Sequence, residues 1–360
     1  MAEEQRTSAL TAETGASRRR EILHLLADGG LHSGAEAAAR LGISRAAVWK
    51  TLRRAADELG LEIESQRGRG YRLRRPLELL EAERIRAALS TTAGARIAGI
   101  EVLEVVDSTN TRLMQSAAAG GASGAVCLAE RQRAGRGRSG RGWVSPFGAN
   151  IYLSMLWRYP LAPAELGGLS LACGVAVARV LKSSGVAEIG LKWPNDLHWR
   201  RRKLGGLLLE VAGESQGPSH VVVGLGVNRR LSPAQAQDID QPWSDLTAVL
   251  GDAVPGRNAL AARLIEGLVS ALSDYGRAGL APFLEDWHTF DAYLGEPVEV
   301  VTGDRRVAGI AAGVAGDGGL LLDTAAGRQC FHGGEVSLRP DAAGTKQKGG
   351  FTTKDTKQGK

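Results

Sequence analysis

The first 75 residues constrain the fold most, because three helix signals follow one another closely there and a basic ribbon comes directly after them. The first helix is predicted from Arg18 to Gly29, where apolar residues recur at helical spacing and glycine ends the pattern. The second and third begin after Ser33 and Ser44, because a serine side chain accepts a hydrogen bond from the free N–H groups of a first helical turn. The third helix ends at Gly60.

The segment that follows, residues 61–74, alternates apolar and polar residues around the sequence RGRG at 67–70. This alternation is typical of a two-stranded ribbon with a basic tip. Three helices and a ribbon together predict a winged helix-turn-helix domain over residues 18–80.

Positive charge is concentrated in the same part of the chain. Residues 18–75 carry thirteen lysines and arginines against seven acidic residues, and the whole chain has a formal net charge of +6. Outward arginines usually form a solvated helix face, but these lie on the third helix of a helix-turn-helix beside a basic ribbon. We therefore expect DNA binding, with this helix in the major groove and cations on the phosphates. The residues expected to contact DNA are Ser44, Arg45, Lys50, Arg53 and Arg69.

From about residue 81 the pattern changes to alternating strands and helices, which indicates a mixed α/β domain over residues 81–292. Apolar runs predict strands at residues 100–106, 125–129, 150–156, 189–192, 207–211 and 221–227. Helices are predicted at residues 164–182 and 259–275, with shorter ones after Ser108 and around 282–287.

Between residues 293 and 340 the pattern changes again, to five short apolar runs separated by Gly-Asp and Gly-Gly pairs. The runs are PVEVV, RRVAGI, GLLLD, QCFH and EVSL. Strands of this length suit a small barrel. The ends of the chain, residues 1–17 and 341–360, are polar and aperiodic, so we expect a flexible arm and a disordered basic tail. The expected fold class is multidomain α+β.

Cysteine usage and hydropathy bear on the compartment. The three cysteines, Cys127, Cys173 and Cys330, lie far apart and show neither a metal-ligand spacing nor a disulfide framework. We expect no membrane partner, since no run approaches the ~18 apolar residues that a membrane helix requires. These features favour a cytoplasmic protein.

The sequence AGRGRSGRGW at residues 134–143 is the strongest candidate for a functional loop. Four glycines alternate with three arginines in it. Glycine lets backbone N–H groups approach an anion, and arginine supplies a planar fork of donors for phosphate or carboxylate. A nucleic-acid-binding RGG segment is the rival interpretation, but the loop lies between two predicted strands and not in a low-complexity region. We expect an anion-binding loop in an active site.

Three further motifs stand close to predicted strand ends. KWPND at residues 192–196 is followed by Lys203, which becomes a candidate clamp for a phosphate or acyl oxygen when paired with Asp196. DSTN at 107–110 is by itself only a good helix N-cap. GLGVN at 224–228 is weak alone.

In this order, DSTN, RGRSGR, KWPND with Lys203, and GLGVN resemble the biotin-protein ligases, over residues 18–340. HSGAEAAARLGISRAAVWK and QRGRGYRL are similar to the DNA-binding segment and wing of the bifunctional bacterial form, which also represses the biotin operon. The resemblance implies a catalytic core like that of class II aminoacyl-tRNA synthetases, with a mixed sheet backed by helices, and a small SH3-like β-barrel at the end. Ser139 stands where some relatives carry arginine, and His332 where an aromatic residue can occur.

The resemblance also implies roles for individual residues. Lys203, Arg138 and Asp196 are the expected catalytic residues, with Asp196 orienting Lys203 or helping to hold magnesium. The expected biotin-binding residues are Ser108, Thr109, Asn110, Gln132, Arg136, Gly137, Arg138, Lys203 and Gly206. The expected ATP-binding residues are Arg138, Trp143, Lys192, Asn195, Asn228 and Trp243. No residue is assigned as a dedicated metal ligand, although Mg²⁺ is expected with ATP.

The implied reaction forms biotinyl-5′-adenylate from biotin and ATP and then transfers biotin to a lysine of a biotin carboxyl carrier domain. Operator DNA is the second expected partner, and a homodimer is expected when the adenylate is bound. Two alternatives stay open: a lipoate-type ligase, and a ligand-sensing repressor without ligase activity.

Overall fold

The computed structural model describes residues 17–303, 305–332 and 337–340. Contacts divide the chain into two compact units. The first unit comprises Met1–Ala292 with Gly316–Gly318, and the second comprises Tyr293–Ala315 with Gly319–Lys360. The expected flexible arm and basic tail lie almost entirely outside the described residues.

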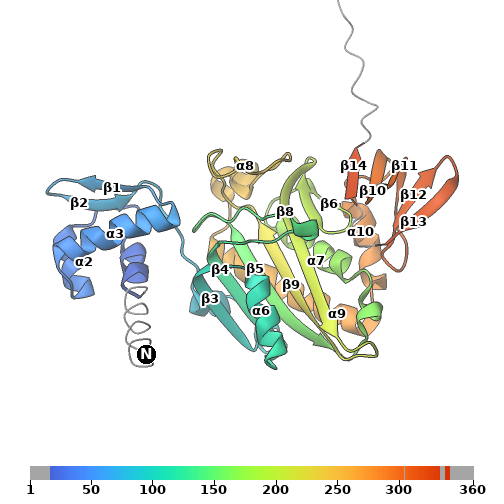
Figure 1. The fold of residues 1–360 in the computed structure, drawn as a ribbon, viewed down its shortest axis with the longest axis horizontal. Helices are drawn as coiled ribbons and strands as arrows, with labels where there is room; N and C mark the ends of the chain where they lie inside the picture. Colours follow the sequence, from blue (N-terminus) through green and yellow to red (C-terminus); the bar gives the residue numbers. More distant parts are fainter. Residues whose placement is uncertain (1–16, 304, 333–336, 341–360) are drawn as a thin grey trace, which may run out of the picture. The chain divides into compact units, whose positions relative to one another are not determined.

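The helix-turn-helix predicted from the sequence forms at the start of the first unit (Figure 1). A helix over residues 17–26 is followed by α2 (Gly34–Leu41) and α3 (Arg45–Leu59). Strands β1 (Ile63–Gln66) and β2 (Gly70–Leu73) then pair antiparallel to make the wing. The apolar side chains of all these elements meet in one core, formed by Ile22, Leu25, Leu26, Ala37, Leu41, Val48, Leu52 and Leu73.

Both helix starts were predicted correctly from serine. The Ser33 hydroxyl accepts a hydrogen bond from Glu36 N at 3.0 Å, and the Ser44 hydroxyl accepts one from Ala47 N at 3.2 Å. Each cap satisfies an N–H group that has no partner inside the helix.

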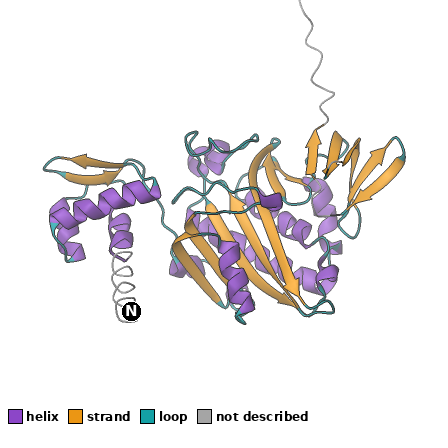
Figure 2. Cartoon of the chain, in the orientation of Figure 1, coloured by secondary structure: helices purple, strands orange, loops and turns teal. Residues whose placement is uncertain are grey.

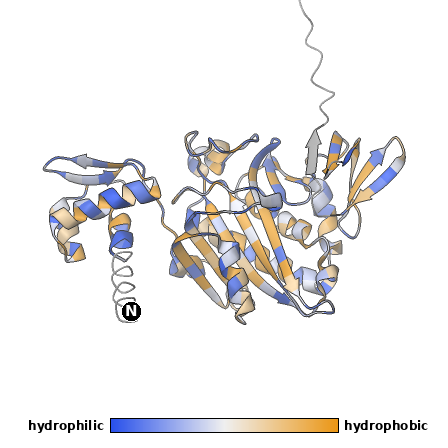
Figure 3. Cartoon of the chain, in the orientation of Figure 1, coloured by the Kyte–Doolittle hydropathy of each residue, from blue (hydrophilic) through white to orange (hydrophobic). Residues whose placement is uncertain are grey.

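A mixed sheet of seven strands forms the centre of the first unit (Figure 2). The strand order is β3-β4-β5-β9-β8-β7-β6, in which β3 and β4 are parallel and the other neighbours antiparallel. The strands are β3 (Gly99–Val106), β4 (Ala125–Gln132), β5 (Ile151–Tyr159), β6 (Ile189–Lys192), β7 (Asp196–Trp199), β8 (Arg202–Gly213) and β9 (Ser219–Val227). Figure 3 shows how hydrophobic the central strands are, as burial on both faces requires.

Helices cover this sheet. Helix α6 (Thr109–Ala118) packs on β4, β5 and β9, whereas α7 (Leu169–Ser183) and α9 (Arg257–Ala278) pack against each other and lie behind the sheet in Figure 1. The shorter helices are α4 (Ala82–Ala87), α5 (Thr91–Gly94), α8 (Leu246–Leu250) and α10 (Leu284–Phe290), with 3₁₀ turns η2 (Pro163–Leu166), η3 (Gly251–Ala253) and η4 (Ala281–Phe283).

One stretch of the chain bears on the expectation about membranes. Residues 163–183 are long and apolar enough to cross a membrane, judged by length and composition alone. Most of this stretch is buried inside the protein, and α7 packs against α9. A helix that is apolar on nearly all sides is therefore explained here by burial in a core.

The second unit is an antiparallel sheet with the order β13-β12-β11-β10-β14. Its strands are β10 (Pro297–Thr302), β11 (Arg305–Val314), β12 (Leu320–Thr324), β13 (Gly327–Phe331) and β14 (Ser337–Pro340). The first four predicted runs fall on β10–β13; of the fifth, residues 335 and 336 lie outside the described residues, and Ser337 and Leu338 belong to β14. The expected closed SH3-like barrel is not confirmed, because no pairing joins the outer strands β13 and β14 among the described residues.

Candidate active site

The loop at residues 134–143 folds back on itself as a narrow hairpin between β4 and β5. Gly137 N donates to Arg141 O at 2.7 Å, and Trp143 N donates to Gly135 O at 2.8 Å. At its tip a 3₁₀ turn, η1 (Arg138–Gly140), has the backbone φ of Gly140 at 72°, a value that favours glycine. The alternation of glycine and arginine thus gives a closed hairpin carrying several guanidinium groups.

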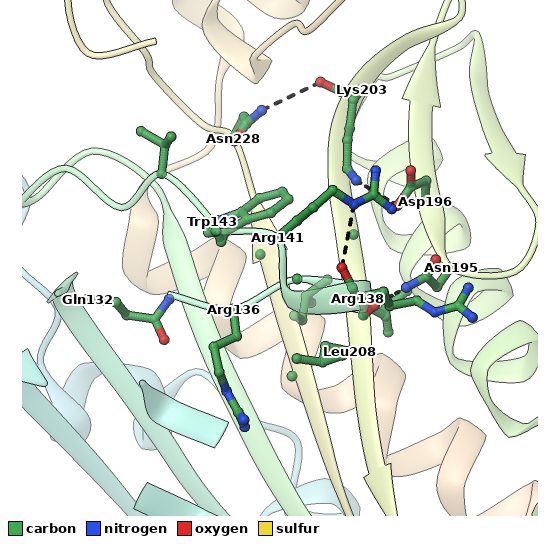
Figure 4. Close-up of a pocket in the computed structure, with 18 of the residues that line it drawn as sticks. Gln132, Arg136, Arg138, Arg141, Trp143, Asn195, Asp196, Lys203, Leu208 and Asn228 are labelled. Carbon is green, nitrogen blue, oxygen red and sulfur yellow. Dashed lines mark hydrogen bonds and ion pairs between the residues drawn. The ribbon is translucent and has the colours of Figure 1, made fainter. Parts of the chain in front are cut away.

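An ion pair lies opposite this hairpin. Lys203 Nζ on β8 is 2.8 Å from Asp196 Oδ1 on the neighbouring strand β7, and both side chains are largely buried (Figure 4). Burial alone would raise the pKa of Asp196, but the charge and hydrogen bond of Lys203 outweigh burial and lower it. The Asp196 carboxyl group therefore stays ionised near neutral pH.

Arginines of the hairpin bring further positive charge close to the Lys203–Asp196 pair. Burial lowers the pKa of Arg138, whereas the nearby Asp196 carboxylate raises it and Arg141 lowers it further. Guanidinium groups keep their proton in proteins despite such shifts. The site consequently holds several cations near the Asp196 carboxylate, and these cations can stabilise an anionic ligand.

Buried polar side chains form the floor of the pocket at the start of α6. Gln132 Oε1 accepts hydrogen bonds from Thr109 N and Thr109 Oγ1 at 2.9 and 3.1 Å. The Ser154 hydroxyl on β5 lies 2.7 Å from Thr109 Oγ1 and 2.6 Å from Asn110 Oδ1. Ser108 occupies the N-cap position of α6, but its side chain makes no capping hydrogen bond, contrary to what DSTN suggested.

The glycines of the GLGVN motif on β9 leave room for side chains that pack directly on the backbone of the strand. A Cβ atom at Gly226 would lie 2.5 Å from Trp143 Cε2, and one at Gly224 would overlap the Asn110 amide. At the end of the strand, Asn228 Nδ2 donates to Ser244 O at 3.2 Å and so holds the downstream loop. The glycines let the indole of Trp143 and the amide of Asn110 reach the sheet.

Trp143 has a polar atom without a partner. Its indole Nε1 is buried and makes no hydrogen bond to any of the described residues. The ammonium of Lys203 lies 5.6 Å from the centroid of its ring. A buried donor without an acceptor is costly, so an acceptor on a bound ligand would be stabilising here.

These elements line one pocket. Among the residues predicted as catalytic, biotin-binding or ATP-binding, those that line it are Ser108, Thr109, Asn110, Gln132, Arg136, Gly137, Arg138, Trp143, Asn195, Asp196, Lys203, Gly206, Asn228 and Trp243. Lys192 is not among the lining residues. It lies at the end of β6, opposite Asp196 in the strand register, and its charge helps to lower the pKa of that carboxyl.

Some residues of the site were not predicted. The segment Asp238, Ile239, Asp240 and Gln241 lines the pocket, as do Arg141 and several apolar residues of β5, β8 and β9. Ser154 was also missed, although a serine inside the apolar strand sequence IYLSMLWRY was a usable signal for a buried polar contact. Nothing local in the sequence marked 238–241.

The residues predicted to bind DNA lie exposed on the helix-turn-helix. Ser44, Arg45, Lys50 and Arg53 are exposed on or next to α3, and Arg69 is exposed in the turn of the wing. Arg53 stacks 5.4 Å from the ring centroid of Trp49, itself an exposed residue. The hydroxyl oxygen of Ser44 also accepts the capping hydrogen bond of α3 from Ala47 N.

Fold and site together define a class of protein: a DNA-binding module joined to an enzyme core whose pocket is built for an anionic ligand. Three family models match the chain, namely an HTH domain over residues 18–72, the Biotin/lipoate A/B protein ligase family over 102–228, and a Biotin protein ligase C terminal domain over 293–339. The chain belongs to the biotin protein ligase family, in the bifunctional form that joins a ligase to a helix-turn-helix repressor domain.

Individual relatives support the same assignment. The bifunctional ligase/repressor BirA of Escherichia coli is 40% identical over 319 residues, which cover 89% of this chain and 96% of that protein. The biotin–[acetyl-CoA-carboxylase] ligase of Mycobacterium tuberculosis is 36% identical over 271 residues, covering 74% and 97%. The solved biotin protein ligase of Aquifex aeolicus in complex with biotin and ATP superposes with a TM-score of 0.58 at 28% identity, covering 68% of this chain and all of that one.

Proposed function

We propose that this protein forms biotinyl-5′-adenylate from biotin and ATP, transfers biotin to a lysine of a biotin carboxyl carrier domain, and represses transcription by binding operator DNA. The observation that carries the proposal is the buried Lys203–Asp196 pair in a pocket closed by the arginine-glycine hairpin. The implied roles of Lys203 in bridging the acyl and phosphate oxygens, and of Trp143, Asn195, Asn228 and Trp243 near the nucleotide, belong to this proposal.

In the first step a biotin carboxylate oxygen attacks the α-phosphorus of ATP, and pyrophosphate leaves with the electron pair of the broken P–O bond. Two anions must approach each other, so the site has to supply positive charge where charge develops. Lys203 and Arg138 provide it, and Asp196 keeps the ammonium of Lys203 in place. The partnerless Nε1 of Trp143 supplies a further donor.

Mg²⁺ fits this pocket, because carboxylates of Asp196, Asp238 and Asp240 line it together with the cations. Magnesium takes few protein ligands where phosphates and waters complete its shell. When bound, it would neutralise charge on the phosphate oxygens. Asp238 and Asp240 are the better candidates to hold it, since Asp196 is already paired with Lys203.

In the second step the acceptor lysine must lose a proton, because its ordinary pKa is about 10.4 and only the free amine is a nucleophile. The amine attacks the acyl carbon, an amide bond forms, and AMP leaves with the electrons of the anhydride bond. Asp196 is our candidate to assist the deprotonation. It lies in the pocket and is ionised, although its lowered pKa also makes it a weak base.

The regulatory part of the proposal assigns residues 18–80 to DNA binding, 81–292 to catalysis and 293–340 to a small C-terminal domain. We further propose a cytoplasmic location and a homodimer that forms when the adenylate is bound. A palindromic operator would then meet two copies of α3. The exposed cations of α3 and the wing support this part of the proposal.

The test is pyrophosphate exchange into ATP that depends on biotin, followed by transfer of labelled biotin to an acceptor domain. Lys203→Ala and Arg138→Gly should each lower the exchange rate by about 100-fold or more, because each removes a cation at the developing charge. Near-normal turnover in both variants would refute the site assignment. Glu101→Gln, which removes an exposed ion pair with Arg112, serves as the control.

Two alternatives make different predictions. The matching family model includes lipoate ligases, so thermal unfolding should be compared with biotin and with lipoate present. The helix-turn-helix and the RGRSGR hairpin favour biotin. A sensor without ligase activity would bind biotin and operator DNA but release no pyrophosphate.

A further inference from the structure

Glu210 does not line the pocket, yet it touches both the floor of the pocket and the hairpin over it. It lies on β8 (Arg202–Gly213), beyond Lys203 and Gly206 along the same strand. Its Oε2 atom accepts a hydrogen bond from Asn110 Nδ2 at 2.9 Å and forms an ion pair with Arg136 Nη2. One carboxylate oxygen therefore joins two segments that are separate in the sequence.

The two partners differ in burial, since the Arg136 side chain is 43% exposed. Asn110 is 3% exposed and is further held by Leu208 O at 3.1 Å. Arg136 belongs to the hairpin, whose backbone hydrogen bonds at residues 135–143 run between its own two sides. These bonds shape the hairpin, whereas two side chains attach it to the sheet: Arg136 through its ion pair with Glu210 on β8, and Trp143 through its packing at Gly226 on β9.

The direction of the side chains fits an attachment of this kind. In Figure 4 the Arg136 side chain extends away from Arg138 and Arg141, which lie nearer to Lys203. Arg136 thus turns to the sheet, and the other two arginines are placed on the side of the lysine–aspartate pair.

We propose that Glu210 is a positioning residue that fastens the arginine-glycine hairpin over the pocket through Arg136 and retains the bound adenylate. The inference rests on the proposed function for the identity of the ligand, but the attachment itself is a property of the free protein. Glu210 does not touch the reacting atoms. Its loss should accelerate escape of the adenylate more than it slows formation.

The variant Glu210→Gln tests the attachment in the full chain without ligand. It keeps the size of the side chain and an oxygen acceptor for Asn110, but it removes the charge that pairs with Arg136. Trypsin cleaves after the hairpin arginines, so we expect about fivefold faster cleavage there in the variant. Glu101→Gln loses a comparable ion pair outside the hairpin and should leave the rate unchanged. Equal cleavage of wild type and Glu210→Gln would overturn the proposal.

The same variant is then measured with ligand. Release of preformed biotinyl-adenylate should be about fivefold faster, while the maximal rate of pyrophosphate exchange stays within twofold. In a double-mutant cycle, Arg136→Gln and Glu210→Gln should be clearly non-additive, because each removes the same pair. Additive effects would contradict the pairing. A wild type without any biotin-dependent exchange would refute the proposed function, and the cleavage experiment would still decide the role of Glu210.

Discussion

Single residues in this site are held by partners on other segments of the chain. Lys203, Thr109 and Asn110 each have a fixed polar partner, and each partner comes from a different strand. Such networks are expensive to leave incomplete inside a protein, because every unpaired polar atom keeps its desolvation cost. A substitution that removes one of these polar groups should therefore lower the stability of the protein more than the same substitution at an exposed position.

His198 gives a prediction about pH. It is 4% exposed on β7, and burial lowers the pKa of its imidazole to about 4. In the unfolded chain the imidazole titrates near 6.5, so between pH 6.5 and about 4 the unfolded state binds more protons. Stability is thus lost as the pH falls through this window.

We expect His198→Phe to remove this dependence. Between pH 7.5 and 5 the free energy of unfolding of the wild type should fall by about 2 kcal/mol more than that of the variant. Urea unfolding at the two pH values measures the difference. Parallel losses in both proteins would contradict a neutral buried imidazole.

The two glycines of β9 give a prediction about specificity. An added Cβ at Gly224 displaces Asn110, and one at Gly226 displaces Trp143. Misplacing a binding group by a fraction of its size costs about tenfold or more. We expect Gly224→Ala to raise the KM for biotin and Gly226→Ala the KM for ATP. Gly99→Ala, where a Cβ meets nothing within 4 Å, is the control. The same change in both constants for both variants would contradict separate subsites.

Among the structural elements, the connection between the wing and α4 is held by buried side chains of the catalytic core. The buried Arg257 side chain on α9 donates to Glu78 O at 2.7 Å and to the Glu130 carboxylate at 2.6 Å. Glu130 in turn accepts a hydrogen bond from Leu80 N, and Asn258 Nδ2 donates to Leu79 O. The backbone of residues 78–81 therefore finds its partners in the side chains of the catalytic core.

Arg257→Met should destabilise the protein by about 3–5 kcal/mol, because it leaves the Glu130 carboxylate buried and without its charge partner. Adding Glu130→Gln to this variant should recover part of the loss, since no buried charge then remains. Chemical unfolding measures both. Arg277→Ala, which removes an exposed ion pair from the same helix, should stay within about 0.5 kcal/mol of the wild type. A loss from Arg257→Met no larger than this control would contradict a structural role.

Long apolar or capped elements could be predicted from the sequence, and contacts between distant segments could not. Predicted strands at 100–106 and 221–227 lie within β3 and β9, because each is a run of seven residues rich in valine, isoleucine and leucine. The strand β7, DLHW, alternates polar and apolar residues but was missed, because it is only four residues long. Glu130 and Arg257 are 127 positions apart, so only the folded chain reveals their pair.

In the site, too, residues in local motifs could be predicted and contacts between distant segments could not. Lys203, Asp196 and the hairpin were found because each lies in a recognisable motif. Ser154 and Glu210 support these motifs from largely apolar strands, in which a polar residue is visible but its partner is not. Their roles depend on which strands become neighbours, and the local sequence does not specify strand order.

At the scale of the whole molecule, the DNA-binding surface and the pocket use different residues of one chain. The pocket residues come from the sheet, α6 and the loops beside them, whereas the exposed cations of the helix-turn-helix take no part in lining the pocket. Substitutions in one place should therefore leave the other chemistry intact, unless a signal passes between them through ligand binding.

DNA binding of the full chain tests this separation. Each phosphate contact contributes about one unit to the slope of log affinity against log salt, because counterions are released. Lys50→Ala and Arg53→Ala should each reduce this slope by about one and leave biotin-dependent pyrophosphate exchange unchanged. Arg54→Ala is a matched change on the same helix, but Arg54 is paired with Glu58 and should matter less. Lys203→Ala should do the reverse in the absence of ligand, with exchange lost and the slope unaltered. If Lys50→Ala and Arg53→Ala left the slope unchanged, α3 could not be the helix that meets the phosphates.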